Sequence, residues 1–265
     1  MVTGVHEVCT VEGFTLMRAL IDADIFCYSF GSARKDDGNP LQWPFVISRM
    51  DGMLQRILEE TGSESHQLYL TGKGNFRESI ATIKPYKGHR TAEKPYWYQH
   101  VKDFLIYHRD AKVIEGMEAD DAMGIAQTDS TVICSLDKDL DMIPGYHYNW
   151  NKEGVWYQDE ISALHCFYCQ LLTGDATDNI PGLYGVGKSS TLLRNIKSLD
   201  SELSMFLLVR EEYSKRFGSY WKTFLIENAR LLWILREPEQ DIAERLNKLE
   251  ETLNESDCNA AVSSS

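Results

Sequence analysis

Eight acidic residues stand in four short groups of the sequence, and their type and spacing suit metal-ion chemistry. The groups are Asp22; Glu118, Asp120 and Asp121; Asp137 and Asp139; and Asp175 and Asp178. Two carboxylates about 4 Å apart repel by about 4 kcal/mol at an effective dielectric constant of about 20, so a cluster of them favours divalent cations. Oxygen ligands without histidine or thiolate suit Mg²⁺ or Mn²⁺. Two such ions can activate water, hold a phosphate and stabilise the leaving oxygen, which is the chemistry of phosphodiester hydrolysis. Any one of these acids alone could be a helix cap or a solvated side chain.

A basic and aromatic segment precedes the second acidic group. Its cations are Lys73, Arg77, Lys84, Lys87, Arg90, Lys94 and Lys102. Such side chains neutralise phosphate oxygens, and the rings of Tyr86, Tyr96 and Trp97 offer faces on which unpaired bases can stack. A solvated helix with buried aromatic residues is the alternative interpretation. The segment supplies local positive charge in a chain whose net charge is −13.

Residues 182–189 read GLYGVGKS, which matches the phosphate-binding pattern G-x-x-x-x-G-K-[ST] of ATPases. That loop must follow a buried strand, whereas the preceding residues TGDATDNIP are polar, so the pattern does not predict an ATPase. The spacing instead favours a turn between helices, in which Gly185 and Gly187 let the backbone approach a phosphate and Lys188 adds charge. With Ser189 these residues would contact duplex DNA without reading its bases, although a plain helix-helix turn is the simpler alternative.

The elements that must position these residues alternate between strand and helix. Short apolar runs predict strands at MRALID, HQLYL, KVIE and TVICSLD, with a hairpin at YHYNW and VWYQ. Helices are expected at PFVISRMDGMLQRILEETG, PYWYQHVKDFLIYH and EADDAMGIAQ, and four more after Asp159. This order predicts a three-layer α/β fold with a mainly parallel sheet, whose strand ends would bring the acids together. We expect an α/β core over 14–158, a helical region over 159–236 and an acidic terminal helix with a frayed end over 237–265.

Composition is that of a globular protein: 43% of the residues are hydrophobic and 25% are charged. No stretch approaches the roughly 20 apolar residues of a membrane helix, and the first fifteen residues do not resemble a secretion signal. The six cysteines are scattered, and Cys166 and Cys169 lack the partners of a zinc site. We therefore expect a soluble, reduced, cytoplasmic protein without a membrane partner, in the host cytoplasm if a phage encodes it.

Five blocks of the chain together resemble the metal-dependent 5′-nucleases, which include flap endonucleases, the 5′-nuclease domain of bacterial DNA polymerase I and short phage 5′-3′ exonucleases. In family order they are LIDADIF, GNFRESIATIKPYKGHR, EGMEADDAMGIAQ, VICSLDKDLDMIPG and LLTGDATDNIPGLYGVGKSS. The resemblance implies a PIN-like core in which the eight acids bind two Mg²⁺ or Mn²⁺ ions. It also implies that Arg77, Lys87 and Arg90 hold the scissile phosphate and that GLYGVGKSS forms a helix-three-turn-helix element, often with a bound K⁺.

The sequence departs from the family pattern in two places. The family usually has an aspartate after the second strand, whereas this chain has Thr71 and Gly72 there, so we expect weaker binding of the first ion. Only 27 residues separate Arg90 from Glu118, which is short for the arch of flap endonucleases and favours the phage exonuclease subgroup. Asp24, Asp141 and Cys27 receive no role from the resemblance.

The sequence thus predicts a 5′-3′ exonuclease that hydrolyses DNA by a two-metal-ion mechanism, with flap cleavage left open. Its partner would be duplex DNA with a 5′ end, a nick or a flap, and an RNA/DNA hybrid and the oligomeric state are left open. Lys73, Lys84 and Lys94 are expected to contact the DNA backbone. Two alternatives remain. One is a structure-specific DNA-binding protein with an impaired metal site, suggested by Gly72, and the other is a phosphatase that uses the D-x-D pair of LIDADIF.

Overall fold

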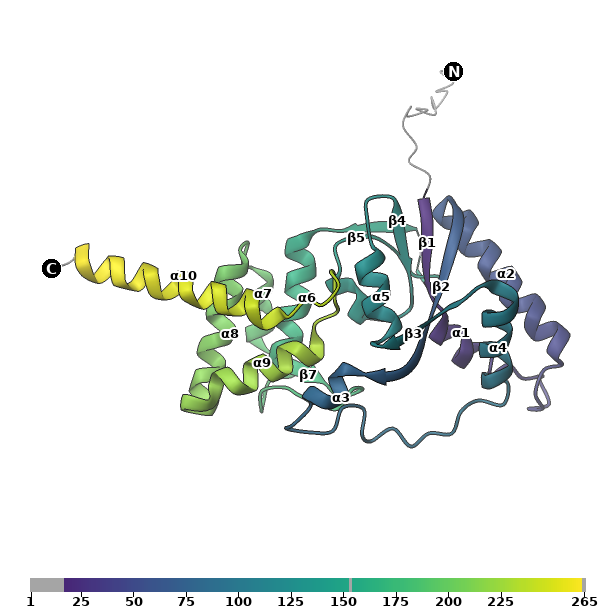
Figure 1. Cartoon of the computed structure of the whole chain (residues 1–265), viewed down its shortest axis with the longest axis horizontal. Coiled ribbons are helices and arrows are strands. Elements are labelled where there is room, and N and C mark those ends of the chain that lie inside the picture. The colour runs from purple at the N-terminus through teal and green to yellow at the C-terminus, as the bar shows by residue number, and fades with distance from the viewer. Residues whose placement is uncertain (1–16, 153, 264–265) are drawn as a thin grey trace, which may run out of the picture.

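The computed structural model describes residues 17–152 and 154–263, which form a central sheet between two helical layers (Figure 1). The strands are β1 (Met17–Asp22), β2 (Ser63–Asn75), β3 (Lys112–Gly116), β4 (Thr131–Cys134), β5 (Gly145–Tyr148) and β6 (Val155–Gln158). Their order is β3-β2-β1-β4-β5-β6, and only β6 is antiparallel to its neighbour. Because parallel strands point the same way, the ends of β1, β3 and β4 lie along one edge of the sheet.

One face of the sheet is covered by helices from the first half of the chain. These are α1 (Ala23–Ser29), α2 (Trp43–Thr61) and α4 (Tyr98–Arg109). Helix α2 buries Val46, Met50, Leu54 and Ile57, spaced three and four apart, against the sheet residues Ile21, Leu68 and Val132. This spacing places them on one helical face, so burial of that face fixes α2 on the sheet.

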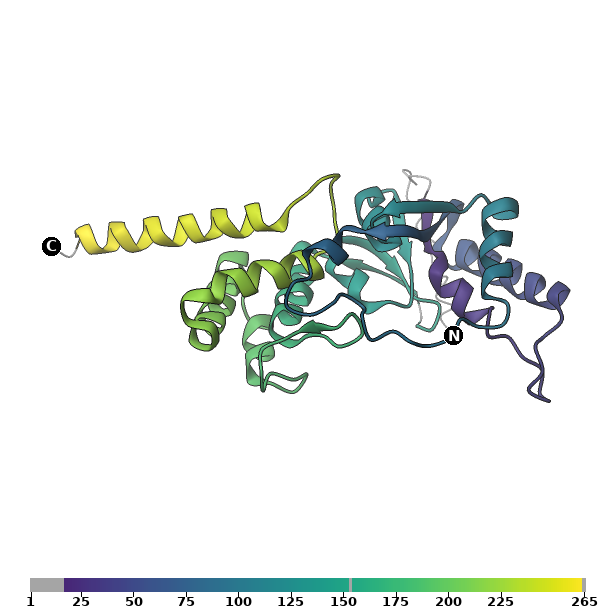
Figure 2. The same cartoon turned by 60° about the horizontal axis from the view of Figure 1, so that its bottom comes forward.

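The other face of the sheet joins the core of the helical region. It is covered by α5 (Ala119–Ala126) and the 3₁₀-helix η1 (Lys138–Met142). The helical region comprises α6 (Glu160–Thr173), α7 (Thr191–Lys197), α8 (Glu202–Phe217) and α9 (Trp221–Leu232). Leu20 and Ile133 of the sheet belong to the same apolar cluster as Phe167 of α6 and Trp233 after α9, so no solvent layer separates the two parts. Both views show the helices of this region directly beside the sheet and α5 (Figures 1 and 2).

The predicted α/β fold with its mainly parallel sheet and helical region is confirmed, and several bounds differ from the expectation. Strand β2 continues to Asn75, and the short helix α3 (Phe76–Ile80) follows it. Helix α9 ends at Leu232, where the backbone of Trp233 is extended, instead of at Leu235. Two-residue strands β7 (Gly174–Asp175) and β8 (Ile180–Pro181) form in the expected loop.

The chain ends in helix α10 (Ile242–Ser263), which extends past the other helices in both views. Its first turns are anchored because Ile242 and Leu246 are buried in the core of the helical region. Residues 14–16 of the expected core lie outside the described residues. Within those residues, no helix is long and apolar enough to cross a membrane.

Candidate active site

Three acidic residues cap helices at the carboxyl end of parallel strands. Asp22 ends β1 and caps α1, Glu118 follows β3 and caps α5, and Asp137 follows β4 and caps η1. Each cap places a carboxylate next to free N–H groups and the positive end of the helix dipole, which stabilises its charge. The three helix caps therefore place carboxylates from three separate segments at the same edge of the sheet.

Asp22 lies deepest in this cluster and is 5% exposed. Its Oδ2 accepts a hydrogen bond from the Ser135 hydroxyl at 2.9 Å, and its Oδ1 accepts one from the Asp24 N–H at 3.2 Å. Burial, together with the nearby charges of Asp24 and Asp137, raises the pKa of Asp22 from 3.8 to about 7. The bond from Ser135 joins positions more than a hundred apart in the sequence, and it brings Asp137, two residues further on, to the same hollow as Asp22.

Asp120 and Asp139 experience the same crowding. Burial and the charges of Asp22, Asp137 and Glu118 raise the pKa of Asp120 well above its usual value. Burial and the charge of Asp137 raise the pKa of Asp139 to about 7, although Lys138 opposes this shift.

Asp175 connects the third acidic group with the fourth, since its carboxyl lies close enough to that of Asp139 for the two to share one proton in a hydrogen bond. Burial opposes ionisation of Asp175, but this bond and the N–H of Thr177 at 2.6 Å outweigh it and lower the Asp175 pKa. Asp178 follows in the same turn. All four acidic groups of the sequence thus meet in one region.

Two of the predicted phosphate-binding cations lie directly on the acidic cluster. Lys87 forms ion pairs with Glu118 and with Asp178, the latter at 3.6 Å, and Arg90 donates to Asp178 at 2.7 Å. The hydroxyl of Tyr86 lies 3.0 Å from Glu118 and 2.7 Å from Asp178, so it can donate to either carboxylate. Arg90 is about half exposed, with 47% of its side chain accessible. These cations are held beside the acids and remain open to solvent.

Arg77 and Asp121 differ from this arrangement because they neutralise each other inside the protein. Both guanidinium NH groups of Arg77 donate to Asp121, at 2.6 and 2.8 Å, and the side chains are 3% and 0% exposed. Arg77 also donates to the carbonyls of Leu231 and Trp233. Asp121 accepts the N–H of Leu235 as well. The structure therefore places this pair as a buried link between α3, α5 and the end of α9.

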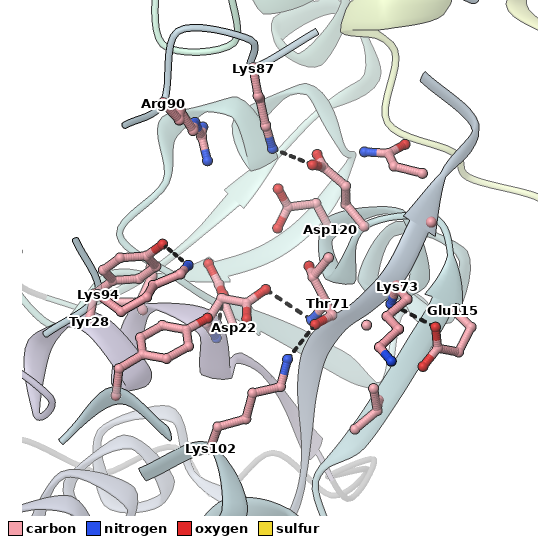
Figure 3. A pocket seen from close by; sticks show the side chains of 18 of the residues that line it. Asp22, Tyr28, Thr71, Lys73, Lys87, Arg90, Lys94, Lys102, Glu115 and Asp120 are labelled. Atoms are coloured by element: carbon pink, nitrogen blue, oxygen red, sulfur yellow. Dashed lines mark hydrogen bonds and ion pairs between the residues drawn. The ribbon is translucent and has the colours of Figure 1, made fainter. Parts of the chain in front are cut away.

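A cleft of about 860 Å³ opens above the acids (Figure 3). Figure 3 shows Lys87 and Arg90 on one wall and Lys94 and Lys102 on the opposite wall, with Asp22 and Asp120 between them. The cleft is thus acidic at its base and basic along its sides. This charge distribution suits metal ions below and a phosphate chain above.

The remaining predicted contacts are spread around this cleft. Lys73 is exposed at its rim, and its N–H donates to Glu115 at 2.6 Å. Lys94 packs over the rings of Tyr28 and Tyr98 at 4.7 and 4.3 Å. Lys84 lines a separate, shallower hollow beside Asp175. Lys73 and Lys94 therefore share one cleft, and Lys84 faces another.

The expectation that Tyr86 offers a face for base stacking is wrong. Tyr86 is 9% exposed, and burial together with the Glu118 and Asp178 charges raises its pKa. Trp97 packs against Trp43 at a ring distance of 5.4 Å and donates to the carbonyl of Leu41. Tyr96 is 64% exposed and alone of the three keeps an open ring.

The glycine turn lies between β8 and α7, with the backbone of Gly185 in the left-handed region at φ +78°. Leu183 and Val186 are buried and anchor the turn, while Gly187, Lys188 and Ser189 are exposed. The preceding strand β8 has two residues and pairs with β7 alone, which agrees with the rejection of an ATPase loop.

Asp24 brings a carboxylate to Thr71, which lies inside β2. Its Oδ2 accepts the Thr71 N–H at 3.0 Å, and the Thr71 hydroxyl accepts the N–H of Ala119 at 3.0 Å. Sequence reasoning gave Asp24 no role. The D-x-D spacing at the start of a helix was the signal that could have placed it beside Asp22.

The donor set fits a hard divalent cation in its chemistry. Within residues 17–152 and 154–263, no group of three or more His, Cys, Asp or Glu side chains is arranged to hold a metal ion. Every acid of the cluster offers oxygen, however, and the pKa values of Asp22 and Asp120 are raised first by burial and then by neighbouring negative charge, which a cation would relieve. Lys87 and Arg90 already neutralise part of the negative charge of the cluster, through their ion pairs with Glu118 and Asp178.

Solved structures with a similar fold include proteins of bacteriophage T5. A T5 protein crystallised with metal ions has a TM-score of 0.61 and 15% identity, covering 88% of this chain and 91% of that one. The chain has the 5′-nuclease fold. A mutant T5 5′-exonuclease has a TM-score of 0.59 and 15% identity, with 89% and 98% of the chains covered. A T5 flap endonuclease in a complex with DNA and metal ions has a TM-score of 0.52 and 16% identity, with 88% and 98% covered.

No protein-family model matches the chain, and no curated protein sequence matches it.

Proposed function

We propose that the protein is a divalent-metal-dependent nuclease that hydrolyses DNA from a 5′ end, as a 5′-3′ exonuclease. The observation that carries the proposal is the meeting of four acidic segments beneath Lys87 and Arg90, in two adjoining hollows that share Glu118, Asp120 and Asp137. The likeness of the fold to the T5 5′-exonuclease and flap endonuclease supports it. Flap cleavage is the second activity to compare in the same assay.

Two groups of acids would hold the ions, which we take to be Mg²⁺ or Mn²⁺. Asp22, Glu118, Asp120 and Asp137 would hold the first ion, and Asp139, Asp175 and Asp178 would hold the second. We leave Asp121 out of the ligand set, because both of its oxygens already accept hydrogen bonds from Arg77. When bound, the ions would supply Lewis acidity toward the phosphate and lower the pKa of water.

The side chains of this chain would bind and orient the phosphate. Lys87 and Arg90 exchange their carboxylate partners for the non-bridging phosphate oxygens, which carry more charge as the water oxygen attacks. Stabilisation that grows in the transition state accelerates the reaction, so these cations contribute to kcat. Tyr86 keeps Glu118 and Asp178 in place by donating its hydroxyl proton between them. Arg77 acts through Asp121 by holding the start of α5.

The duplex would lie across the helical region. The exposed turn with Gly185, Gly187, Lys188 and Ser189 presents N–H groups and a charge to one DNA strand, in the manner of a helix-three-turn-helix element that could also hold K⁺. Lys73, Lys84 and Lys94 would add contacts to the backbone. Such contacts position the substrate without selecting a sequence.

The test is Asp137→Asn with 5′-labelled and 3′-labelled duplex, nicked and flapped DNA in Mg²⁺ and then in chelator. Asparagine keeps the acceptor oxygen for the Asp139 N–H, which lies 2.9 Å from Asp137 Oδ1, so the fold should survive. We expect cleavage to fall at least a hundredfold. Asp129→Asn, at an exposed turn residue, is the matched control. Full activity of Asp137→Asn would refute the proposal.

A structure-specific DNA-binding protein with an impaired metal site is the second candidate, favoured by Thr71 and Gly72, where the 5′-nuclease family usually has an aspartate. It predicts tight binding to forked DNA with no cleavage in either Mg²⁺ or Mn²⁺. A phosphatase would instead transfer phosphate to Asp22, which acid trapping of the labelled protein would detect. The same preparation of protein can be used for both measurements.

A further inference from the structure

Glu227 is a buried carboxylate in helix α9 that binds a loop from the other half of the chain. It is 8% exposed. Its Oε1 accepts the N–H groups of Thr82 and Ile83 at 2.8 and 2.7 Å, and its Oε2 accepts the Thr82 hydroxyl. A buried carboxylate is costly unless hydrogen bonds compensate it, and these donors supply that compensation. The residue therefore joins α9 to a loop 145 positions earlier.

The loop that Glu227 binds is the one that carries Lys87 and Arg90. Residues 81–97 connect α3 to α4 without a helix or strand of their own. Beyond Ile83, the loop is held by the turn after β7. Lys87 donates its N–H to the Asp178 carbonyl at 2.9 Å, and the Asn179 amide donates to the Pro85 carbonyl at 2.8 Å.

Lys87 itself has a backbone conformation that needs this support. Its φ is +52°, in the left-handed region that L-residues other than glycine rarely adopt. Such a conformation is unfavourable for a residue with a side chain, and it persists when neighbouring contacts enforce it. Glu227 at one end and the Asp178–Asn179 turn at the other provide such contacts.

We propose that Glu227 is a positioning residue that holds Lys87 and Arg90 over the acidic cluster. The inference rests on the proposed nuclease function and extends it to a residue that touches neither phosphate nor metal. Four positions separate Ile83, the nearer of the two residues whose N–H groups Glu227 binds, from Lys87. Rotation of the loop about that point would move both cations together. A displacement of about 1 Å at a reacting group can cost about a hundredfold in rate.

The bonds from Thr82 and Ile83 to Glu227 form a clamp between the loop and α9. This clamp also connects the region that would bind DNA to the position of Lys87 and Arg90. Helix α9 holds the same segment at a second point, because Arg77 of α3 donates to the carbonyls of Leu231 and Trp233. The segment from Arg77 to Ile83 is thus fixed at both ends by one helix of the region that would bind the duplex. DNA bound to that region would meet Lys87 and Arg90 at a fixed distance.

The test compares Glu227→Ala with Glu227→Gln, which keeps an acceptor oxygen, and with Glu212→Ala as a control. Glu212 of α8 pairs only with the nearby Lys215 and Arg216 in the described contacts. The first readout is hydrogen exchange of the Thr82 and Ile83 amides in the DNA-free protein. We expect at least tenfold faster exchange in Glu227→Ala, and near wild-type exchange in Glu227→Gln and Glu212→Ala.

The second readout is cleavage kinetics with DNA affinity in Ca²⁺. We expect Glu227→Ala to lower kcat about 10- to 100-fold with KM and the Ca²⁺ affinity changed less than about twofold, and Glu227→Gln to restore most of kcat. If Glu227→Ala does not fold, Glu227→Asp replaces it, since its shorter side chain keeps the charge and cannot reach both N–H groups. Faster exchange of both amides with lowered kcat supports the proposal.

Two results would overturn the inference. Unchanged amide exchange in Glu227→Ala would show that Glu227 does not hold the loop. Faster exchange with a wild-type kcat would show that holding the loop does not position the cations. A failure of the nuclease function itself is distinguishable, because then the wild-type protein would not cleave DNA whereas the exchange comparison would still report on the clamp.

Discussion

The substitution Asp22→Asn should stabilise the metal-free protein while abolishing cleavage. The Asp22 pKa is raised from 3.8 to about 7 by burial and by the charges of Asp24 and Asp137. Between these values the folded protein binds the proton more tightly than the unfolded chain, so stability falls as the pH rises through that window. A pKa difference of one between the folded and unfolded states corresponds to about 1.4 kcal/mol, which makes the penalty about 4 kcal/mol above pH 7.

An asparagine at position 22 has no charge and avoids most of that penalty. Its oxygen can still accept the Asp24 N–H, but its amide places a donor near the Ser135 hydroxyl where Asp22 had an acceptor. We therefore expect a net gain of about 2 kcal/mol at about pH 8, which is an increase in Tm of about 4–8 °C. More than half of the gain should disappear at about pH 5, where most of the native aspartate is protonated.

The assay is thermal unfolding followed by circular dichroism at both pH values, first with chelator and then with millimolar Mg²⁺. Mg²⁺ should stabilise the wild-type protein more than Asp22→Asn, because binding to the folded state alone raises stability. Asp129→Asn, at an exposed position, should have the same Tm as the wild type throughout. A Tm of Asp22→Asn that is equal to or below the wild-type value at pH 8 in chelator would refute the electrostatic argument.

Four further outcomes are expected. Lys87→Ala should lower kcat about 10²–10³-fold with little change in duplex affinity, measured by single-turnover cleavage and by binding in Ca²⁺. Lys188→Ala should weaken duplex binding and reduce the slope of log affinity against log salt by about 1, and an unchanged slope would exclude the turn from the interface. Arg77→Ala should destabilise the protein by about 3–5 kcal/mol in denaturant unfolding, because it leaves Asp121 buried without its cation. Thr71→Asp should shift metal saturation from millimolar toward micromolar Mg²⁺ by calorimetric titration, whereas micromolar saturation of both sites in the wild type would contradict the expected weak site.

The sequence was sufficient to predict the sheet and the meeting of the acids because both follow from local patterns. Strand ends in a parallel α/β sheet share one edge, so Asp22, Glu118 and Asp137 could be brought together before any coordinates were known. The ends of the helices could be predicted less closely from the sequence where the chain changes direction. Helix α9 ends at Leu232 because Trp233 becomes extended and is buried in the core. The apolar residues continue to Leu235 in the sequence, so their pattern does not indicate this end.

The pairing of particular side chains could not be predicted in the same way. Arg77 stands in a basic segment that favours contact with phosphate, yet the structure buries it against Asp121 and two carbonyls from α9. The sequence similarly predicts that Tyr86 stacks on a base, but Tyr86 is buried and its hydroxyl contacts the carboxylates of Glu118 and Asp178. Both outcomes depend on elements more than thirty positions away, whose packing no local pattern reports.

The ion pairs of Lys87 with Glu118 and of Arg90 with Asp178 have a thermodynamic consequence. Each cation is paired with a carboxylate that would also bind a metal ion. Metal binding would therefore release the cation for the phosphate, and phosphate binding would release the carboxylate for the metal. Linkage requires this assistance to be mutual: the free energy by which metal tightens DNA binding equals that by which DNA tightens metal binding. We therefore expect positive cooperativity between ion and substrate, with the protein's own charges acting as competitors that both ligands displace.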